Sequence, residues 1–191
     1  MKLKIIGIVG IVVILLGITA IIGYNRLVDM DEDINYYHSQ IENRLQERHD
    51  KIGQILGAVQ GLQEHAETIY DAITAARAAY SAAVADGNIE DLIEADAAEA
   101  IALTDVLVAV EDNPLITATS GYNSLIDEIS STESALSVAR RDYNLAVADY
   151  NAGVRKFPAV LYAGIFGFER EAVYWKMNEG ADEVPVIDFG D

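Results

Sequence analysis

A run of apolar, uncharged residues near the N-terminus most constrains what this chain can fold into. Residues 5–23 read IIGIVGIVVILLGITAIIG, without a single charge. At about 1.5 Å per residue, a helix of that length spans roughly 28 Å, close to the ~30 Å hydrocarbon core of a bilayer. We therefore predict that residues 1–23 are a membrane anchor, which contacts lipid through residues 5–23.

Two other interpretations of this run stay open. A cleaved signal peptide has a shorter apolar region, usually about 7–15 residues, and then a small-x-small site. Ile18-Thr19-Ala20 is a poor match to such a site. The second alternative is a pilin-like helix that packs in the core of a filament.

The flanking charges indicate an orientation. Lys2, Lys4 and the terminal amine precede the run, whereas Arg26 follows it and several acidic residues come next. Positive charge near a membrane helix tends to stay on the cytoplasmic side. We expect a single-pass protein of the cell membrane, with the large domain extracytoplasmic.

The charge balance excludes some partners and some chemistry. The chain has 31 acidic and 13 basic residues, for a net charge of −18. Such a surface repels phosphate, so no nucleic-acid partner is expected. An adaptation to high salt and an ordinary acidic surface both fit this excess. Because the chain has no Cys, it has no disulfide, thiolate metal site or Cys nucleophile.

Apolar residues recur in a heptad pattern over residues 27–83, and Asp31, His38 and Arg48 interrupt it. The pattern predicts one helix of roughly 85 Å. One line of the pattern is Leu27, Ile34, Ile41, Ile55, Leu62, Ile69, Ala76 and Ala83, and the other is Leu45, Ile52, Val59, Ala66, Ile73 and Tyr80.

Two further helices follow this one. Asp86-Gly87-Asn88 predicts a turn with Asn88 as N-cap, then a helix over residues 89–110. A third helix is expected over residues 120–156, ending at Phe157-Pro158. No long run alternates with period two, so the fold class is all-α. We expect a long-helix antiparallel bundle of three or four helices over residues 24–178, and an acidic C-terminal tail over 179–191.

The pair Tyr-Asn recurs in one register of the third helix. Each Tyr lies on the apolar seam, and each Asn lies about 100° round the helix. The polar line beside the seam predicts one of two arrangements. It is either a polar strip at the edge of the buried face, without a specific partner, or a stripe that hydrogen-bonds a partner helix and fixes its register. The residues concerned are Tyr122, Tyr143, Asn144, Tyr150 and Asn151.

Three glycines and two arginines are further candidates for packing and register. Gly53, Gly57 and Gly61 share one helix face, which favours close packing or a kink. Arg48 interrupts the first seam and Arg140 lies at the edge of the third. We expect the guanidinium of each arginine either to pair with an acidic side chain or to reach water at the end of its buried aliphatic part. Asp50 and Glu133 are the candidate partners.

The helix lengths predict self-association. The two shorter helices, of roughly 33 and 55 Å, cannot cover a seam of roughly 85 Å. The uncovered part would be shielded by the apolar segment FPAVLYAGIFGF, residues 157–168, or by another subunit.

Several stretches resemble the LemA family. ARRDYNLAVADYNAGVRKFP, residues 139–158, is similar to its C-terminal hallmark, and YNRLV follows the apolar run as it does in the family. Arg48-His49-Asp50 matches a central motif, although Glu47 replaces an Arg there. The resemblance implies a membrane-anchored helical bundle with links to the cell envelope. It implies no catalytic residues.

No motif for chemistry accompanies this pattern. The three His residues lie on the first helix without a Glu-x-x-His motif, and no G-x-S-x-G or phosphate loop occurs. We therefore expect no enzyme, no cofactor and no metal. The favoured function is a self-associating, membrane-anchored scaffold or interaction protein with an envelope protein partner. The alternative is a subunit of an extracellular filament or another polymer.

Overall fold

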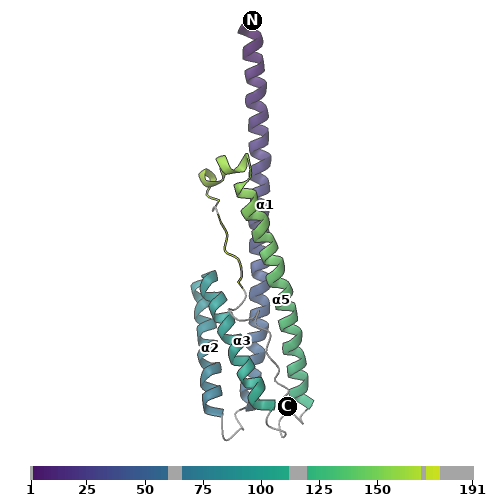
Figure 1. The fold of residues 1–191 in the computed structure, drawn as a ribbon, viewed down its shortest axis with the longest axis vertical. Coiled ribbons are helices and arrows are strands. Elements are labelled where there is room, and N and C mark those ends of the chain that lie inside the picture. Colours follow the sequence, from purple (N-terminus) through teal and green to yellow (C-terminus); the bar gives the residue numbers. More distant parts are fainter. Residues whose placement is uncertain (1, 60–65, 112–119, 169–170, 177–191) are drawn as a thin grey trace, which may run out of the picture. The chain divides into compact units, whose positions relative to one another are not determined.

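The computed structural model describes residues 2–59, 66–111, 120–168 and 171–176. Figure 1 shows helices α1 (Lys2–Val59), α2 (Ala66–Asp86), α3 (Ile89–Glu111) and α5 (Ser120–Arg155), then short 3-10 helices η1 (Ala159–Leu161) and η2 (Ala163–Phe166). The described residues hold no strand, which confirms the all-α class.

Helix α1 is continuous from the apolar run into the bundle. Its 58 residues measure about 87 Å. The large apolar side chains between Ile5 and Ile22 are each about half exposed or more within the chain. By length and composition, this part of α1 could cross a membrane.

The prediction of one helix over residues 27–83 is wrong. Helix α1 ends at Val59 and α2 begins at Ala66. The ring of Tyr80 in α2 lies 4.7 Å, centroid to centroid, from that of His49 in α1, which shows that α2 runs back beside α1. The heptad pattern identified the buried face correctly, since Leu45, Ile52, Ile73 and Tyr80 are all buried. Apolar periodicity specifies a face and does not show where the chain reverses.

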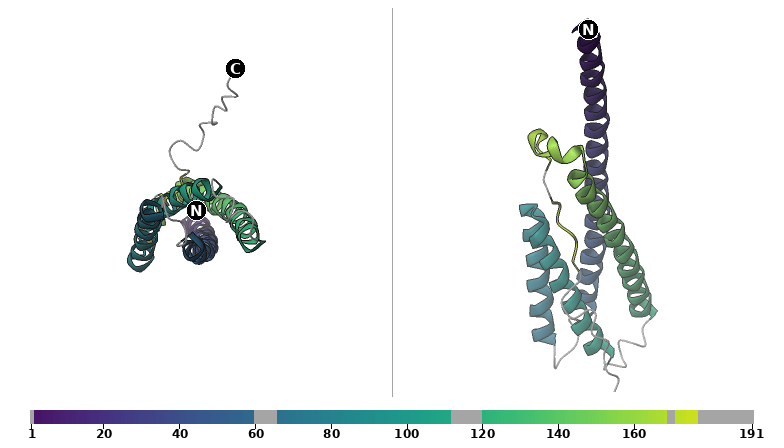
Figure 2. Two further views of the ribbon diagram at one scale, coloured as in Figure 1. Left: turned by 90° about the horizontal axis from the view of Figure 1, so that it is seen from below. Right: turned by 45° about the horizontal axis from the view of Figure 1, so that its top comes forward.

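The turn between α2 and α3 agrees with its prediction. Gly87 has φ +71°, a conformation that glycine adopts without strain. The Asn88 side chain accepts a hydrogen bond of 2.8 Å from the backbone N–H of Glu90, as an N-cap residue does. Helices α2 and α3 lie side by side in Figures 1 and 2. Buried alanines such as Ala83 and Ala95 allow this close approach.

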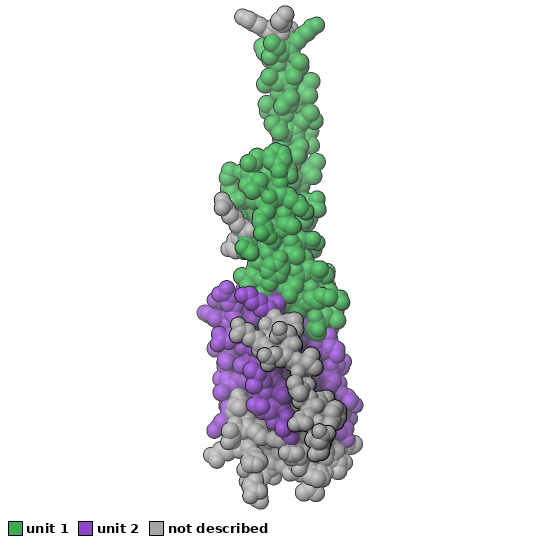
Figure 3. Space-filling view, in the orientation of Figure 1, with its two compact units in different colours: residues 1–43, 137–174 green, residues 44–136, 175–191 purple. Residues whose placement is uncertain are grey.

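The chain divides into two compact units, which Figure 3 colours separately. Unit 1 comprises residues 1–43 and 137–174, and unit 2 comprises residues 44–136 and 175–191. Helices α1 and α5 therefore each contribute to both units.

Unit 1 has an apolar core between α1, α5 and the 3-10 helices. Leu27, Tyr150, Val154, Ala159 and Ala163 are buried there. Partly buried Met30, Ile34, Tyr162, Phe168 and Ala172 pack around them. Segment 157–168 thus shields part of α1, as one alternative for this segment predicted.

Candidate functional site

Arg48 lies at the centre of a buried charge cluster in unit 2, and its side chain is fully buried. Its Nη2 donates to Asp96 Oδ1 at 2.7 Å and lies 3.5 Å from Glu99 Oε2. Its Nη1 donates to Glu133 Oε1 at 3.0 Å. The guanidinium of α1 therefore joins acids of α3 and α5. We call Arg48, His49, Arg77, Asp96, Glu99, Glu133 and Trp175 the charge cluster.

His49 extends this cluster to α2. Its Nδ1 lies 2.6 Å from Glu99 Oε1, and its Nε2 lies 3.2 Å from Arg77 Nη2. A guanidinium can only donate, so His49 Nε2 is the acceptor in that contact. The imidazole is then neutral, with its proton on Nδ1 donated to Glu99.

Trp175 closes the cluster from the C-terminal side. Its Nε1–H donates to Asp96 Oδ2 at 3.2 Å, and its ring is almost fully buried. Asp96 therefore accepts from Arg48 with one oxygen and from Trp175 with the other. Side chains from α1, α2, α3 and α5 and from the segment after α5 meet at this one site.

The pKa values in the cluster follow from burial and charge. Burial alone would lower the pKa of Arg48, but attraction from Asp96, Glu133 and Glu99 outweighs it and raises that pKa. Burial raises the pKa of Glu99, although His49 and Arg48 act to lower it. The arginine stays charged, and burial disfavours the charged form of Glu99.

Sequence reasoning found two of these residues and missed five. Arg48 and Glu133 were candidates, and they are in contact. Asp50, the other candidate partner, is exposed and accepts a 2.9 Å hydrogen bond from Gln46. A signal for the missed acids was present in α3, where Asp96 and Glu99 continue the heptad spacing of Leu92 and Leu103. Charges on an apolar stripe indicated partners for Arg48.

The Tyr-Asn repeat forms a second polar site, in unit 1. Asn151 is fully buried and exchanges two hydrogen bonds with the backbone of Ala172: Nδ2 donates to the carbonyl at 3.0 Å, and Oδ1 accepts from the N–H at 2.7 Å. Tyr143 donates its hydroxyl to the carbonyl of Val173 at 2.9 Å. The stripe thus bonds an extended segment and not a partner helix at these positions.

The other candidate residues lie in several settings. Tyr150 is buried in the unit 1 core, whereas Asn144 and Arg140 are half-buried on α5. Gly53 faces the guanidinium of Arg77, whose atoms are the nearest to a Cβ built there. Phe157 is exposed and Pro158 half-buried, just beyond the end of α5. Gly57 lies in α1 and Tyr122 in α5, but the surroundings of both lie outside the described residues, as does Gly61 altogether.

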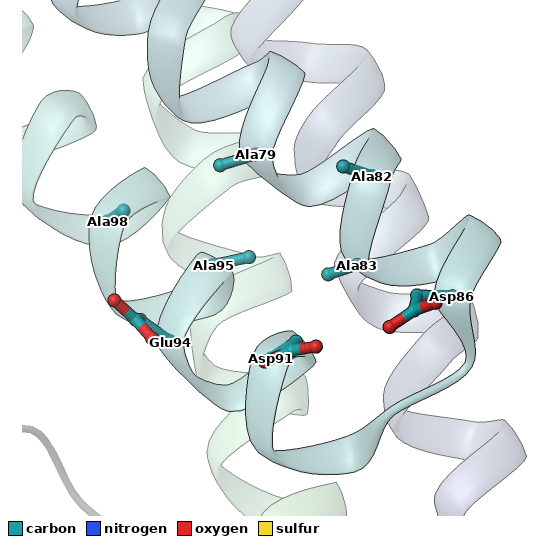
Figure 4. Close-up of a pocket in the computed structure, with 8 residues that line it drawn as sticks. All are labelled: Ala79, Ala82, Ala83, Asp86, Asp91, Glu94, Ala95 and Ala98. Atoms are coloured by element: carbon teal, nitrogen blue, oxygen red, sulfur yellow. The ribbon is translucent and has the colours of Figure 1, made fainter.

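A shallow groove between α2 and α3 is the other notable feature of unit 2. Figure 4 shows its alanine methyl groups facing one another, with Asp86, Asp91 and Glu94 at one side. Its volume is about 480 Å³. The three carboxylates are exposed. Among the described residues, no three His, Asp or Glu side chains are placed to hold a metal ion.

Comparison with known proteins identifies the family. A model described as the LemA family matches residues 37–189, most of the chain. The chain belongs to the LemA family. The resemblance carried by residues 139–158 is thereby confirmed.

Two curated relatives come from Paramagnetospirillum magneticum. They are named magnetosome protein MamQ 2 and magnetosome protein MamQ 1. Each is 31% identical to this LemA family chain over 101 residues, which is 53% of the chain and 36% of the relative. The match thus covers little more than a third of each relative.

Proposed function

We propose that the chain is a membrane-anchored, helical scaffold of the cell envelope, which self-associates, binds envelope proteins and has no catalytic activity. The observation that carries the proposal is the continuity of α1. One uninterrupted helix runs from the apolar segment through residues that pack in both units. A continuous helix fixes the bundle to its anchor more stiffly than a linker would.

The charge cluster supports a structural role over a catalytic one. A catalytic acid or base has to reach a substrate. Arg48, Asp96 and Glu99 are instead buried and bonded to one another. We propose that these contacts hold α1, α3 and α5 in one register, the role inferred for Arg48 from its place in the seam.

The relatives are consistent with a structural function. Their names give a cellular structure, the magnetosome, and no reaction. A chain that shares about half its length with such proteins is more simply explained as part of an assembly than as an enzyme.

The basis for self-association changes with the structure. The uncovered 85 Å seam does not exist, since α1 and α2 are separate helices. Helix α3 instead presents Ile101 and Val108, seven residues apart on one face and about 60% exposed. Exposed apolar side chains on one face favour contact between copies.

The test uses cysteine chemistry in intact cells, which is clean because the chain has no Cys. The variant Ile101→Cys should form disulfide dimers on mild oxidation, whereas Glu90→Cys, at the exposed start of α3, should not. Equal and weak dimer formation by both variants would contradict self-association through this face.

Two further measurements address topology and polymerisation. Asp86→Cys, at the exposed last residue of α2, should react with a membrane-impermeant maleimide in intact cells if the domain is extracytoplasmic. Reaction only after lysis would place the domain in the cytoplasm. Electron microscopy should show discrete membrane particles, and filaments would favour the polymer alternative.

A further inference from the structure

The segment that follows α5 divides into buried and exposed apolar residues. Ala159 and Ala163 point into the unit 1 core and are buried. Five large apolar side chains point outward and are between 53% and 80% exposed: Phe157, Val160, Leu161, Ile165 and Phe166. We call these five residues the outer apolar face. Exposed large apolar side chains at five of ten consecutive positions are uncommon on a surface that faces only water.

This segment lies against the end of the apolar run of α1. The Tyr162 hydroxyl occupies the place that a side chain at Gly23 would fill. The ring of Tyr24 packs edge-on against Phe166 and Phe168, with centroids 5.2 and 5.6 Å apart. Figure 1 shows the segment beside α1 and turned across the direction of α5.

The level of this contact along α1 matches a membrane boundary. About twenty helical residues span the ~30 Å hydrocarbon core. If residues 4–23 do so, Gly23 and Tyr24 stand where hydrocarbon gives way to headgroups. Tyrosines are enriched at that level, and Tyr24 and Tyr162 lie there together.

Basic residues outnumber acidic ones around the outer apolar face, where Glu171 is the acid that lines the same hollow as Leu161 and Ile165. Arg155 and Lys156 directly precede Phe157 and are exposed, and Arg26 is exposed two residues beyond Tyr24. Basic side chains next to an apolar surface suit the phosphates of lipid headgroups. They stand out in a chain with a net charge of −18.

We propose that residues 157–166 form a second membrane contact, with the outer apolar face inserted at the boundary between headgroups and acyl chains of the leaflet from which α1 emerges. The proposal rests on α1 acting as the anchor. A bilayer is then already beside this face, so the segment inserts without a further partner. Two contacts, one spanning and one interfacial, restrict the tilt and rotation of unit 1 on the membrane.

The test measures depth in the bilayer at single positions of the full chain. Ile165→Cys, Leu145→Cys and Ile14→Cys each receive the same environment-sensitive fluorophore and enter vesicles of phosphatidylcholine and phosphatidylglycerol. Leu145 is the matched control, because it is apolar, 59% exposed and in unit 1, about 15 Å before Arg155 along α5. Vesicles carry nitroxides either near the headgroup or deep in the acyl chains.

The label at position 165 should lose roughly half of its emission to the shallow nitroxide and less to the deep one. The label at position 14 should respond most to the deep nitroxide, and the label at position 145 to neither. If position 14 is quenched and position 165 behaves like position 145, the second contact is wrong and the anchor stands. If position 14 is not quenched, the anchor itself fails.

A second copy of the chain is the competing occupant of this face. In that case lipid nitroxides would not quench the label at position 165. The label would instead become protected from aqueous iodide as the protein-to-lipid ratio rises, which would overturn the proposal. Gly23→Leu provides a further check, because its side chain collides with Tyr162. It should weaken shallow quenching at position 165 and leave quenching at position 14 unchanged.

Discussion

The two compact units share helices α1 and α5 and yet build different interiors. Unit 1 buries apolar side chains and holds Asn151 and Tyr143 by neutral hydrogen bonds to the backbone of Ala172 and Val173. Unit 2 buries Arg48 against Asp96, Glu99 and Glu133. A neutral hydrogen bond can be lost singly at modest cost, whereas a buried ion leaves its partners uncompensated. We infer that unit 2 depends on its polar contacts as a set and unit 1 does not.

Arg48→Met should have the largest effect, because it removes the cation and leaves buried Asp96 and Glu99 facing each other. Breaking a buried pair by removing one partner costs about 3–5 kcal/mol. Denaturant unfolding of the detergent-solubilised chain measures it. Trp175, the chain's one tryptophan, is buried beside Asp96 and reports on unit 2 by fluorescence.

Arg44→Met is the control for that variant. Arg44 pairs with Glu47 at 2.8 Å, one turn of α1 before Arg48, but both side chains are well exposed. Exposed pairs contribute about 0–1 kcal/mol. Equal stability losses in the two variants would show that burial of the cluster has no energetic consequence.

Asn151→Ala should have the next largest effect. The N–H and carbonyl of Ala172 would lose their partners, which costs about 1–3 kcal/mol. The loss should be local. Hydrogen exchange of residues 171–174 should accelerate, while Trp175 fluorescence stays close to that of the parent chain. Asn35→Ala, on an exposed face of α1, should change neither. Collapse of both units on Asn151→Ala would contradict their independence.

Tyr143→Phe gives a smaller effect with a distinct pH dependence. Burial raises the pKa of Tyr143 to about 12, against about 10 in an unfolded chain. The folded state holds the proton more tightly, so the stabilisation is complete below about pH 10 and is lost as the pH rises toward 12. The variant should lose about 1 kcal/mol at neutral pH, since Val173 loses its donor.

Above pH 10 the Tyr143→Phe variant should lose stability less steeply than the parent chain. Unfolding curves at pH 8 and pH 11 test this, with Tyr36→Phe as the control because Tyr36 is exposed. Parallel pH profiles for parent and variant would show that Tyr143 does not titrate in a buried setting.

Local signals in the sequence predicted much of the fold. The ends of α3 and α5 agree with prediction to within one residue, because Asn88 caps one helix and Phe157-Pro158 follows the other. The apolar run and the Tyr-Asn register also depend on neighbouring residues alone. The family followed from residues 139–158, and the match over residues 37–189 confirms it.

Contacts between distant residues were harder to predict. The heptad pattern continues past the end of α1, because a seven-residue repeat identifies the buried face of a helix but not the position where the chain reverses direction. Of the two candidate partners of Arg48, Glu133 is in contact with it and Asp50 is not. The partner Asp96, 48 positions away, was not predicted. The polar line with Asn151 predicted a polar strip without a specific partner or a bond to a partner helix, and Asn151 instead bonds an irregular segment without periodicity. In each case tertiary packing selected the partner.

Two helical glycines, Gly53 within α1 and Gly153 in the last turn of α5, test the difference between the two units at the smallest scale. A Cβ at Gly53 would meet the guanidinium of Arg77, and a Cβ at Gly153 would meet Met30 Sδ at 2.8 Å. Replacing either by Ala gains up to ~1 kcal/mol of helix propensity. Met30 can adopt another rotamer, since thioether side chains adapt readily. Arg77 belongs to the charge cluster and is bonded there to His49, which is bonded in turn to Glu99.

Gly153→Ala should therefore be neutral or slightly stabilising, and Gly53→Ala slightly destabilising, with a difference below about 1 kcal/mol. The double variant Gly53→Ala with Arg77→Ala removes the obstacle. The methyl group at position 53 should therefore cost less stability in the Arg77→Ala background than in the parent chain. If the methyl group costs the same in both backgrounds, the strain at Gly53 does not come from Arg77. The dependence of unit 2 on its polar contacts as a set would then not include Arg77.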